Sequence, residues 1–372
     1  ITTRLVGSEM CIRDRFLMDY YEQIYPAAEE CCNSKKSLSE MLDLMAKHPS
    51  LTPDNILLLS QQMPEATALG GYNAWLNEFD RKAKPDAVPI VLLKPTVCKV
   101  HDYKVEEDED GVVADENGEV KSNEYTTEGV EYLPVHLYDI SQTVPSEKTP
   151  DVDTPYLLTP VDIIAGCRDA LKCDVEYTED KTSRLVQYDV VSKKLIIATK
   201  EEAVIAKECV NLLCLKAAEA RTGRNDKLYL RLVAECAAEV VCRVNQINTG
   251  DEIKCLELWN KDKNPEQCLE MLNQVSLASR NVLSQLRQAT NHPVLLDFDE
   301  TCLLNQVLDQ PNATIVRHRL SRLAKHTSIP ILVEAIRSLQ SKLMYFEASS
   351  QVGKVYKDRL DHRIMTLPVY RI

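Results

Sequence analysis

The sequence has no Cys-x-x-Cys pair, although cysteine occurs 13 times among its 372 residues. An odd number of cysteines without metal-ligand spacing, and with no secretory segment, indicates reduced thiols rather than a disulfide framework. Apolar runs of the length of a membrane helix are also missing. Aromatic residues amount to only 6% of the chain, so the core must be mainly aliphatic. These absences predict a cytoplasmic protein with no membrane partner.

Basic residues are in deficit, because 44 Lys and Arg face 57 Asp and Glu and leave a net charge of −13. This charge opposes nucleic-acid binding, which needs clustered Lys and Arg. The deficit is concentrated in residues 106–131, which begin with the acidic run Glu106 to Asp110 and contain a single lysine, Lys121. We predict a solvated acidic loop here, with DNA mimicry or an autoinhibitory tail as the alternative. Without this loop, the stretch from Lys35 to Val105 is roughly neutral.

The length is sufficient for two domains with separate cores. Residues 1–15 do not begin with methionine and resemble a translated sequencing adapter, so we expect them to have no fold or function. Residues 16–145 form the predicted first domain, and residues 146–158, rich in Pro, Asp and Thr, form the predicted linker. Residues 159–290 form the predicted second domain. Residues 291–372 are predicted to be helical, without recognisable chemistry.

Hydrophobic spacing predicts an α+β fold for the first domain. Ser37 and Glu40 have capping-box spacing ahead of a helical pattern, and Pro53 opens a second helix. The pair Gly70-Gly71 is predicted to end a helix, because glycine takes left-handed backbone angles at little cost. A short helix from Tyr72 then precedes a small antiparallel sheet with strands at 90–93, 97–105 and 131–140.

The second domain is predicted to be α+β as well. A helix over 159–171 is followed by strands over 175–177, 185–191 and 195–198, the last two joined as a hairpin. Long helices are then expected over 200–220 and 229–244. Further helices are expected over 266–287 and 331–344.

The most informative stretch runs from Gly70 to Pro95, because it brings aromatic rings and cations together. Rings stack on bases, at roughly 1–3 kcal/mol per base, while Lys and Arg contact phosphates. The candidate nucleic-acid-binding residues are Tyr72, Trp75, Arg81, Lys82, Lys84 and Lys94. In the alternative interpretation, Tyr72 and Trp75 pack between helix and sheet, and the cations belong to an ordinary solvated turn.

This stretch resembles the N-terminal domain of ArdC-type antirestriction proteins. The matching residues are Asn55 to Leu59, Gln62-Met63-Pro64, Ala66-Thr67, Gly71-Tyr72, Trp75, Arg81-Lys82, Lys84 and Ile90 to Pro95, together with the strand and Ser-Gln-Thr ending at Val135 to Thr143. The resemblance implies a single-stranded-DNA-binding domain in a protein of a mobile genetic element, associated with antirestriction or conjugation. A glycine usually follows the lysines of the basic turn, whereas this chain has Asp86-Ala87.

The second domain resembles the ImmA/IrrE-like zinc peptidase domain that often follows the ArdC-type domain. In that family the first helix carries HExxH, whose histidines hold zinc, and the second helix supplies a carboxylate. Glu235 occupies the carboxylate position here. The first helix has Lys207, Glu208 and Asn211 at the motif positions, or Val210, Asn211 and Cys214 in another register. None of the seven histidines restores HExxH, so we predict an inactive pseudopeptidase without zinc or another cofactor.

Three alternatives remain open for this second domain. Cys209 or Cys214 with Glu208 and Glu235 could hold a metal, as in a surviving metallopeptidase with unusual ligands. Lys207 could instead form an ion pair with Glu235 in the vacated site. The inactive domain could also be a protein-interaction module that binds a partner from the same mobile element.

Overall fold

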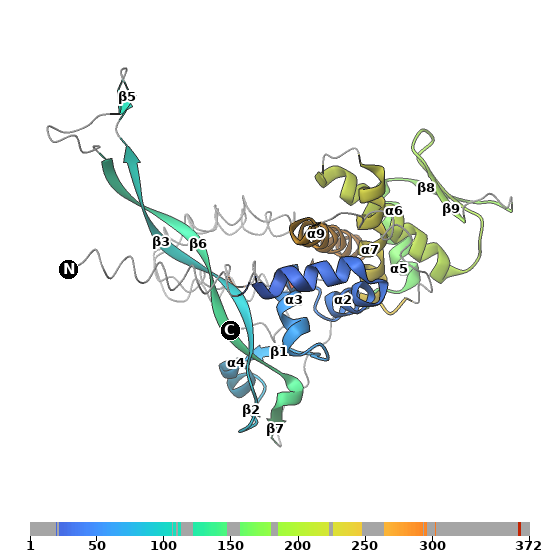
Figure 1. The fold of residues 1–372 in the computed structure, drawn as a ribbon. Coiled ribbons are helices and arrows are strands. Elements are labelled where there is room, and N and C mark those ends of the chain that lie inside the picture. Colours follow the sequence, from blue (N-terminus) through green and yellow to red (C-terminus); the bar gives the residue numbers. More distant parts are fainter. Residues whose placement is uncertain are drawn as a thin grey trace, which may run out of the picture.

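The structure is a computed structural model, and it describes residues 20, 22–105, 107–108, 111–112, 122–146, 157–179, 185–222, 226–247, 264–292, 294–295, 302 and 364–365 (Figure 1). The predictions for residues 1–15, for 331–344 and for most of the linker lie outside these residues. Helices combine with small, mainly antiparallel sheets, which confirms the predicted α+β class.

The described N-terminal part begins with three consecutive helical segments. Residues 22–33 are helical, and α2 (Lys35–Lys47) and α3 (Pro53–Gln62) follow. The N-cap of α2 is Ser34, whose hydroxyl accepts the Ser37 N–H at 3.2 Å, so the predicted capping box at Ser37 is wrong by one helical turn. The start of α3 at Pro53 is confirmed. Proline fits this position because the first helical N–H needs no partner within the helix.

The central sheet has the strand order β1-β6-β3, with β1 (Leu69–Gly71), β6 (Ser122–Asp139) and β3 (Ile90–Val105) all antiparallel. The predicted helix end at Gly70-Gly71 is wrong, because both residues pair with β6, opposite Tyr138 and Leu137. The short helix α4 (Tyr72–Asn77) follows directly.

Strands β3 and β6 continue as a long two-stranded ribbon beyond the part of the sheet that β1 joins, and Figure 1 shows it leading away from the helices. Pairing runs from Ile90 opposite Leu137 to Val105 opposite Ser122. Residues 122–131 of the predicted acidic loop are therefore strand, and its tip includes β4 (Glu107–Asp108) and β5 (Gly111–Val112). The sequence pattern does not predict this strand, because its polar residues lack the apolar alternation of a strand that packs on a core.

Helix α3 protects the outer edge of β3 with two amide side chains. Asn55 donates to the Leu93 carbonyl at 2.9 Å and accepts the Leu93 N–H at 2.7 Å. Gln62 makes the same pair of bonds with Val91, at 2.9 and 2.8 Å. An open strand edge is a template for unwanted pairing, so these amides close the sheet where it meets the core.

The second part contains α5 (Pro160–Leu171), β8 (Asp174–Tyr177), β9 (Val186–Asp189), β10 (Lys194–Ile197), α6 (Glu202–Thr222), α7 (Lys227–Val244) and α9 (Pro265–Ala289). These elements confirm the predicted order of helix, strand, hairpin and helices. In the sheet, β10 lies between β8, which is parallel to it, and β9, which is antiparallel. Helices α5, α6, α7 and α9 pack on one another. A further short pair joins β11 (Val294–Leu295) to β12 (Ile364–Met365).

Helix α2 of the N-terminal part packs against α7 of the second part, and Arg243 joins them. Its guanidinium donates to Asp43 at 2.9 Å, to the Ser39 carbonyl at 2.8 Å and hydroxyl at 3.0 Å, and to Glu239 at 3.2 Å. The buried apolar residues of both parts belong to one contiguous cluster. The two parts therefore share a core across the α2–α7 contact.

The cysteines contribute to this core. Ten of the cysteines in the described part of the chain are buried as free thiols. Burial raises the pKa of Cys31 and of Cys242 to about 12, so both stay protonated at neutral pH. Among the described residues, every helix is either too short or too polar to span a lipid bilayer.

We predict that Arg243→Met lowers the free energy of unfolding by about 1.5–3 kcal/mol, because hydrogen bonds to charged groups contribute that much. Glu239, whose side chain is only 7% exposed, would lose this partner in the interior. Urea unfolding monitored by circular dichroism measures the change. The matched control is Arg231→Met on the same helix, because Arg231 is 70% exposed and lies 3.9 Å from Glu235. Equal effects of the two variants would contradict a stabilising role of Arg243 between α2 and α7.

Candidate nucleic-acid interface

The predicted basic turn lies on a small two-stranded sheet beside α4. Strand β2 (Arg81–Ala83) pairs antiparallel with β7 (Thr143–Pro145), and Lys82 stands opposite Val144. Lys82 and Lys84 are both exposed. Lys94 lies elsewhere, half-buried on β3 opposite Leu133. The structure thus places Lys82 and Lys84 close together, whereas Lys94 lies on β3 of the central sheet.

The Arg81 side chain is held by contacts within the fold. Its Nε donates to the Thr143 hydroxyl at 2.7 Å, and its guanidinium carbon lies 5.9 Å from the centre of the Trp75 ring. The side chain is half-buried. Cation–π contact and the hydrogen bond hold Arg81 against the sheet, so it has less freedom to follow a phosphate than the exposed Lys82.

Trp75 is buried, which corrects the prediction that its ring stacks on a base. The side chain is 1% exposed, and Nε1 donates to the Tyr138 carbonyl at 2.9 Å. Its ring lies 5.4 Å from that of Phe79. The alternative interpretation, packing between helix and sheet, is the one that the structure bears out for Trp75. The indole was ambiguous in sequence because a large aromatic ring serves either purpose.

Tyr72, by contrast, remains open to solvent at the start of α4. It is 50% exposed, and its ring meets the Tyr138 ring edge-on, with centres 6.5 Å apart and planes at 65°. One side of the ring is thus supported while another faces water. This arrangement leaves a π surface available to a planar ligand.

The basic turn docks on Ser141, Gln142 and Thr143. The first two of these residues belong to the 3₁₀ helix η1 (Ile140–Gln142). The Lys84 ammonium donates to the Ser141 carbonyl at 2.7 Å, and the Lys84 N–H to the Gln142 carbonyl at 2.9 Å. The Gln142 amide donates to the Val88 carbonyl at 2.7 Å. The Ser-Gln-Thr sequence that closes the domain thus has a structural role, which the resemblance did not state.

Asp139 connects the segments that meet at the end of β6, here called the Asp139 corner. Its buried carboxylate accepts the N–H groups of Thr67 at 2.7 Å, of Ala68 at 2.9 Å and of Ser141 at 2.9 Å. Burial alone raises the pKa of Asp139, but the hydrogen bonds from Ser141, Ala68 and Thr67 outweigh it, so the pKa lies below its ordinary value. The sequence signal for this residue was weak, because a single Asp at a strand end is common.

His48 also belongs to the Asp139 corner. It is 1% exposed and its Nε2 lies 3.0 Å from the Ala66 carbonyl oxygen. Burial lowers the pKa of His48, although the hydrogen bond to Ala66 and the charge of Asp139 act in the opposite direction. The imidazole is therefore neutral at physiological pH and donates to Ala66.

The residues aligned with a peptidase motif in the sequence do not come together with other ligand side chains in the described part of the chain. Lys207, Glu208 and Asn211 are half-buried on α6, and Glu235 on α7 lies 3.9 Å from Arg231. The two cysteines of the alternative site contact different helices, because the Cys167 thiol of α5 donates to the Cys209 carbonyl at 3.9 Å, while Cys214 lies near Cys242 of α7. Within the described ranges, no three His, Cys, Asp or Glu side chains converge as metal ligands. The donor set therefore does not fit zinc.

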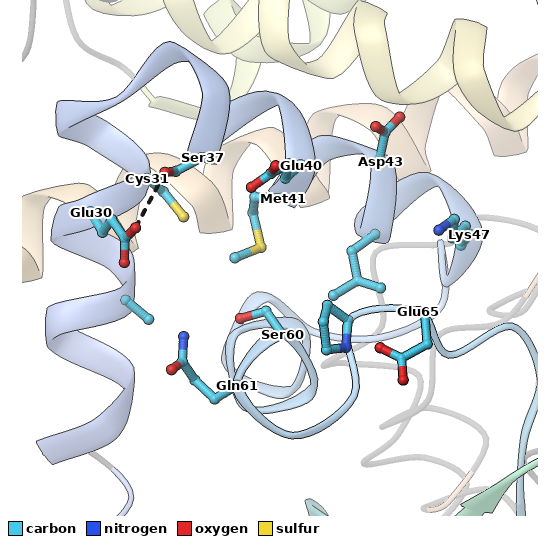
Figure 2. A pocket seen from close by; sticks show the side chains of 13 residues that line it. Glu30, Cys31, Ser37, Glu40, Met41, Asp43, Lys47, Ser60, Gln61 and Glu65 are labelled. Atoms are coloured by element: carbon cyan, nitrogen blue, oxygen red, sulfur yellow. Dashed lines mark hydrogen bonds between the residues drawn. The ribbon is translucent and has the colours of Figure 1, made fainter. Parts of the chain in front are cut away.

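A cavity of about 530 Å³ lies between residues 22–33, α2 and α3 (Figure 2). Its lining includes Glu30, Glu40, Asp43 and Glu65 with one cation, Lys47. Several of these carboxylates have partners, since Asp43 pairs with Arg243, Glu40 with Lys36 at 3.6 Å, and Glu30 accepts the Ser37 hydroxyl at 3.4 Å. The negative lining makes this cavity unsuitable for phosphate, and it lies apart from the basic turn.

We predict that Asp139→Asn lowers the free energy of unfolding at pH 7 by about 1–3 kcal/mol, because one amide NH₂ would face the Ser141 N–H. The folded-state pKa of Asp139 is depressed, so its contribution is present above the unfolded value of about 3.9 and is lost as pH falls through the folded pKa. Urea midpoints across pH 2–7 measure both effects. The Asp139→Asn variant should lack the part of the stability loss at acid pH that comes from Asp139. The exposed control Asp86→Asn should behave as wild type. If the pH dependence of stability were the same in Asp139→Asn as in wild type, the depressed pKa of Asp139 would be contradicted.

We also predict that Trp75→Ala lowers the free energy of unfolding by about 3–5 kcal/mol, as expected for a buried aromatic residue. The matched control is Tyr72→Ala, for which about 0.5 kcal/mol or less is expected because the ring is half-exposed. Chemical denaturation of both variants makes the comparison. A small effect at Trp75 would show that its ring is not part of the core.

No protein-family model matches the chain, and no protein with a curated description matches it. Two crystal structures of the antirestriction protein ArdC from plasmid R388 do match. The metal-free structure is 14% identical, with 64% of this chain and 85% of that chain covered and a TM-score of 0.35. The Mn(II)-bound structure is 10% identical, with 63% and 83% covered and a TM-score of 0.35.

Proposed function

We propose that this protein binds single-stranded DNA through Tyr72, Lys82 and Lys84. The observation that supports the proposal is an exposed ring held beside an exposed pair of cations. Tyr72 contacts Tyr138, and three residues further along the chain the Ser141 carbonyl holds Lys84. Stacking on one ring contributes roughly 1–3 kcal/mol per base, and the two lysines would contact phosphates.

The charge of the whole chain limits the strength of this binding. At a net charge of −13 the long-range field repels a polyanion. Asp86 adds a carboxylate within the basic turn. We therefore expect modest affinity, with rings contributing more than cations, and a preference for single strands, whose bases are accessible.

For the second part we propose a pseudopeptidase without zinc. The support is the set of side chains at the motif positions, where Lys207 and Asn211 replace the two histidines. By the sequence resemblance, we place the protein in a mobile genetic element, in antirestriction or conjugation. There the second part would hold a protein partner from the same element in the cytoplasm. Pulldown with the full chain tests this, and recovery of no specific partner would oppose it.

We predict that full-length protein binds a fluorescein-labelled dT oligonucleotide and that the affinity falls with salt at a slope of roughly −0.7 per neutralised phosphate. Lys82→Gln with Lys84→Gln should flatten the slope by roughly 1.4, because two phosphate contacts are lost. Fluorescence anisotropy at several salt concentrations, with duplex for comparison, measures this.

The matched control replaces two exposed lysines of α2, in the variant Lys36→Gln with Lys47→Gln, and should leave the slope unchanged. Tyr72→Leu should weaken binding without changing the slope, because the ring neutralises no phosphate. Absence of binding by wild type at low salt would overturn the proposed function.

A further inference from the structure

One face of the last part of β6 carries a row of rings that the sequence analysis did not identify. Successive side chains of a strand point to opposite faces. Leu137 and Asp139 point into the core and are 0% and 1% exposed. The alternate residues Tyr132, Pro134, His136 and Tyr138 share the opposite face. Tyr132 is 43% exposed, Pro134 and His136 are exposed, and Tyr138 is half-buried.

Tyr72 continues this row beyond the end of the strand. Its ring meets that of Tyr138 with centres 6.5 Å apart. On the neighbouring strand β1, the residue opposite Tyr138 is Gly70, which has no side chain to cover the ring. Tyr72, Tyr138, His136 and Tyr132 therefore form one row, here called the β6 strip, and it starts at the end of the sheet where the basic turn is docked.

The spacing of the strip matches an extended strand rather than a duplex. Side chains on one face of a strand repeat at about 6.7 Å, twice the rise per residue. Bases in a double helix lie about 3.4 Å apart. Bases placed on successive rings must therefore be unstacked from one another, which only a single strand allows. From Tyr132 to Tyr138 the strand covers roughly 20 Å.

We propose that the β6 strip is the base-stacking surface of this protein and that Tyr132, His136 and Tyr138 each hold a base of single-stranded DNA. This inference rests on the proposed function and extends it, because it names the residues that hold the bases beyond Tyr72. The strand would leave the phosphate contacts at Lys82 and Lys84, pass Tyr72 and Tyr138, and follow β6 past His136 to Tyr132.

The test uses full-length protein and fluorescein-labelled dT oligonucleotides. We expect Tyr132→Leu and His136→Leu each to weaken binding by about 5- to 150-fold, the range for loss of one stacked base. The salt slope should stay unchanged, because these rings neutralise no phosphate. Leucine keeps an apolar side chain of similar bulk on the strand, and equal urea midpoints confirm folding. Tyr132→Phe and His136→Phe keep a ring and should retain wild-type affinity.

The matched control is Tyr177→Leu, because Tyr177 is a 66% exposed tyrosine at the end of β8 in the other sheet. An abasic oligonucleotide supplies the second arm, since it has phosphates but no bases. Wild type and the strip variants should bind it equally, which a purely structural role of the rings would not produce.

Each remaining outcome is decisive. If Tyr132→Leu and His136→Leu bind dT oligonucleotides as wild type does, while the lysine variants lose affinity, the β6 strip is overturned and the proposed function stands. If wild type binds neither oligonucleotide, both are overturned. If the strip variants lose affinity equally for the abasic and dT probes, the rings act through the fold and the stacking assignment fails.

Discussion

The candidate interface depends on one buried carboxylate. Asp139 ends β6 and gathers the N–H groups of Thr67, Ala68 and Ser141 around its oxygens. Its own N–H donates to the Gln142 side chain, which in turn holds the basic turn through Val88. Because a buried donor left without a partner costs about 1–3 kcal/mol, each of these bonds constrains the others. Asp139 thereby sets where Tyr138 lies on one side and where Lys84 is anchored on the other.

Behind this corner, the sheet is held to the helices by polar contacts as well as apolar ones. Asn55 and Gln62 occupy the outer edge of β3, and the Trp75 indole donates to β6. Arg243 joins α2 to α7, so the N-terminal part rests on the helices of the second part. The second part therefore has a structural role that does not require peptidase chemistry: its helices complete the core on which the interface is built.

Aromatic residues show how far sequence reasoning reached at the site. The sequence predicts the same stacking role for Tyr72 and Trp75, whereas the structure has one ring exposed and the other buried. Tyr132, His136 and Tyr138 were overlooked, although their alternation with Leu133, Val135 and Leu137 is visible in the sequence. That alternation predicts a strand, but it does not show that the face with the rings is exposed, because exposure depends on what packs against the strand. The sequence near 122–131 predicts a loop rather than a strand for a related reason, since it has no consistent apolar alternation.

Local spacing, caps and residue identity are enough to predict the α+β class, most helices, the hairpin of the second part and the absence of an HExxH motif. Tertiary contacts, in contrast, place Trp75 in the core and Tyr72 at the surface, anchor the basic turn at Asp139 and join α2 to α7 through Arg243. They also bring Cys209 and Cys214 to different helices. Burial and partner choice are set by elements distant in the chain, such as Thr67 and Asp139 or Asp43 and Arg243. No local pattern records which of several similar residues such a distant partner will meet.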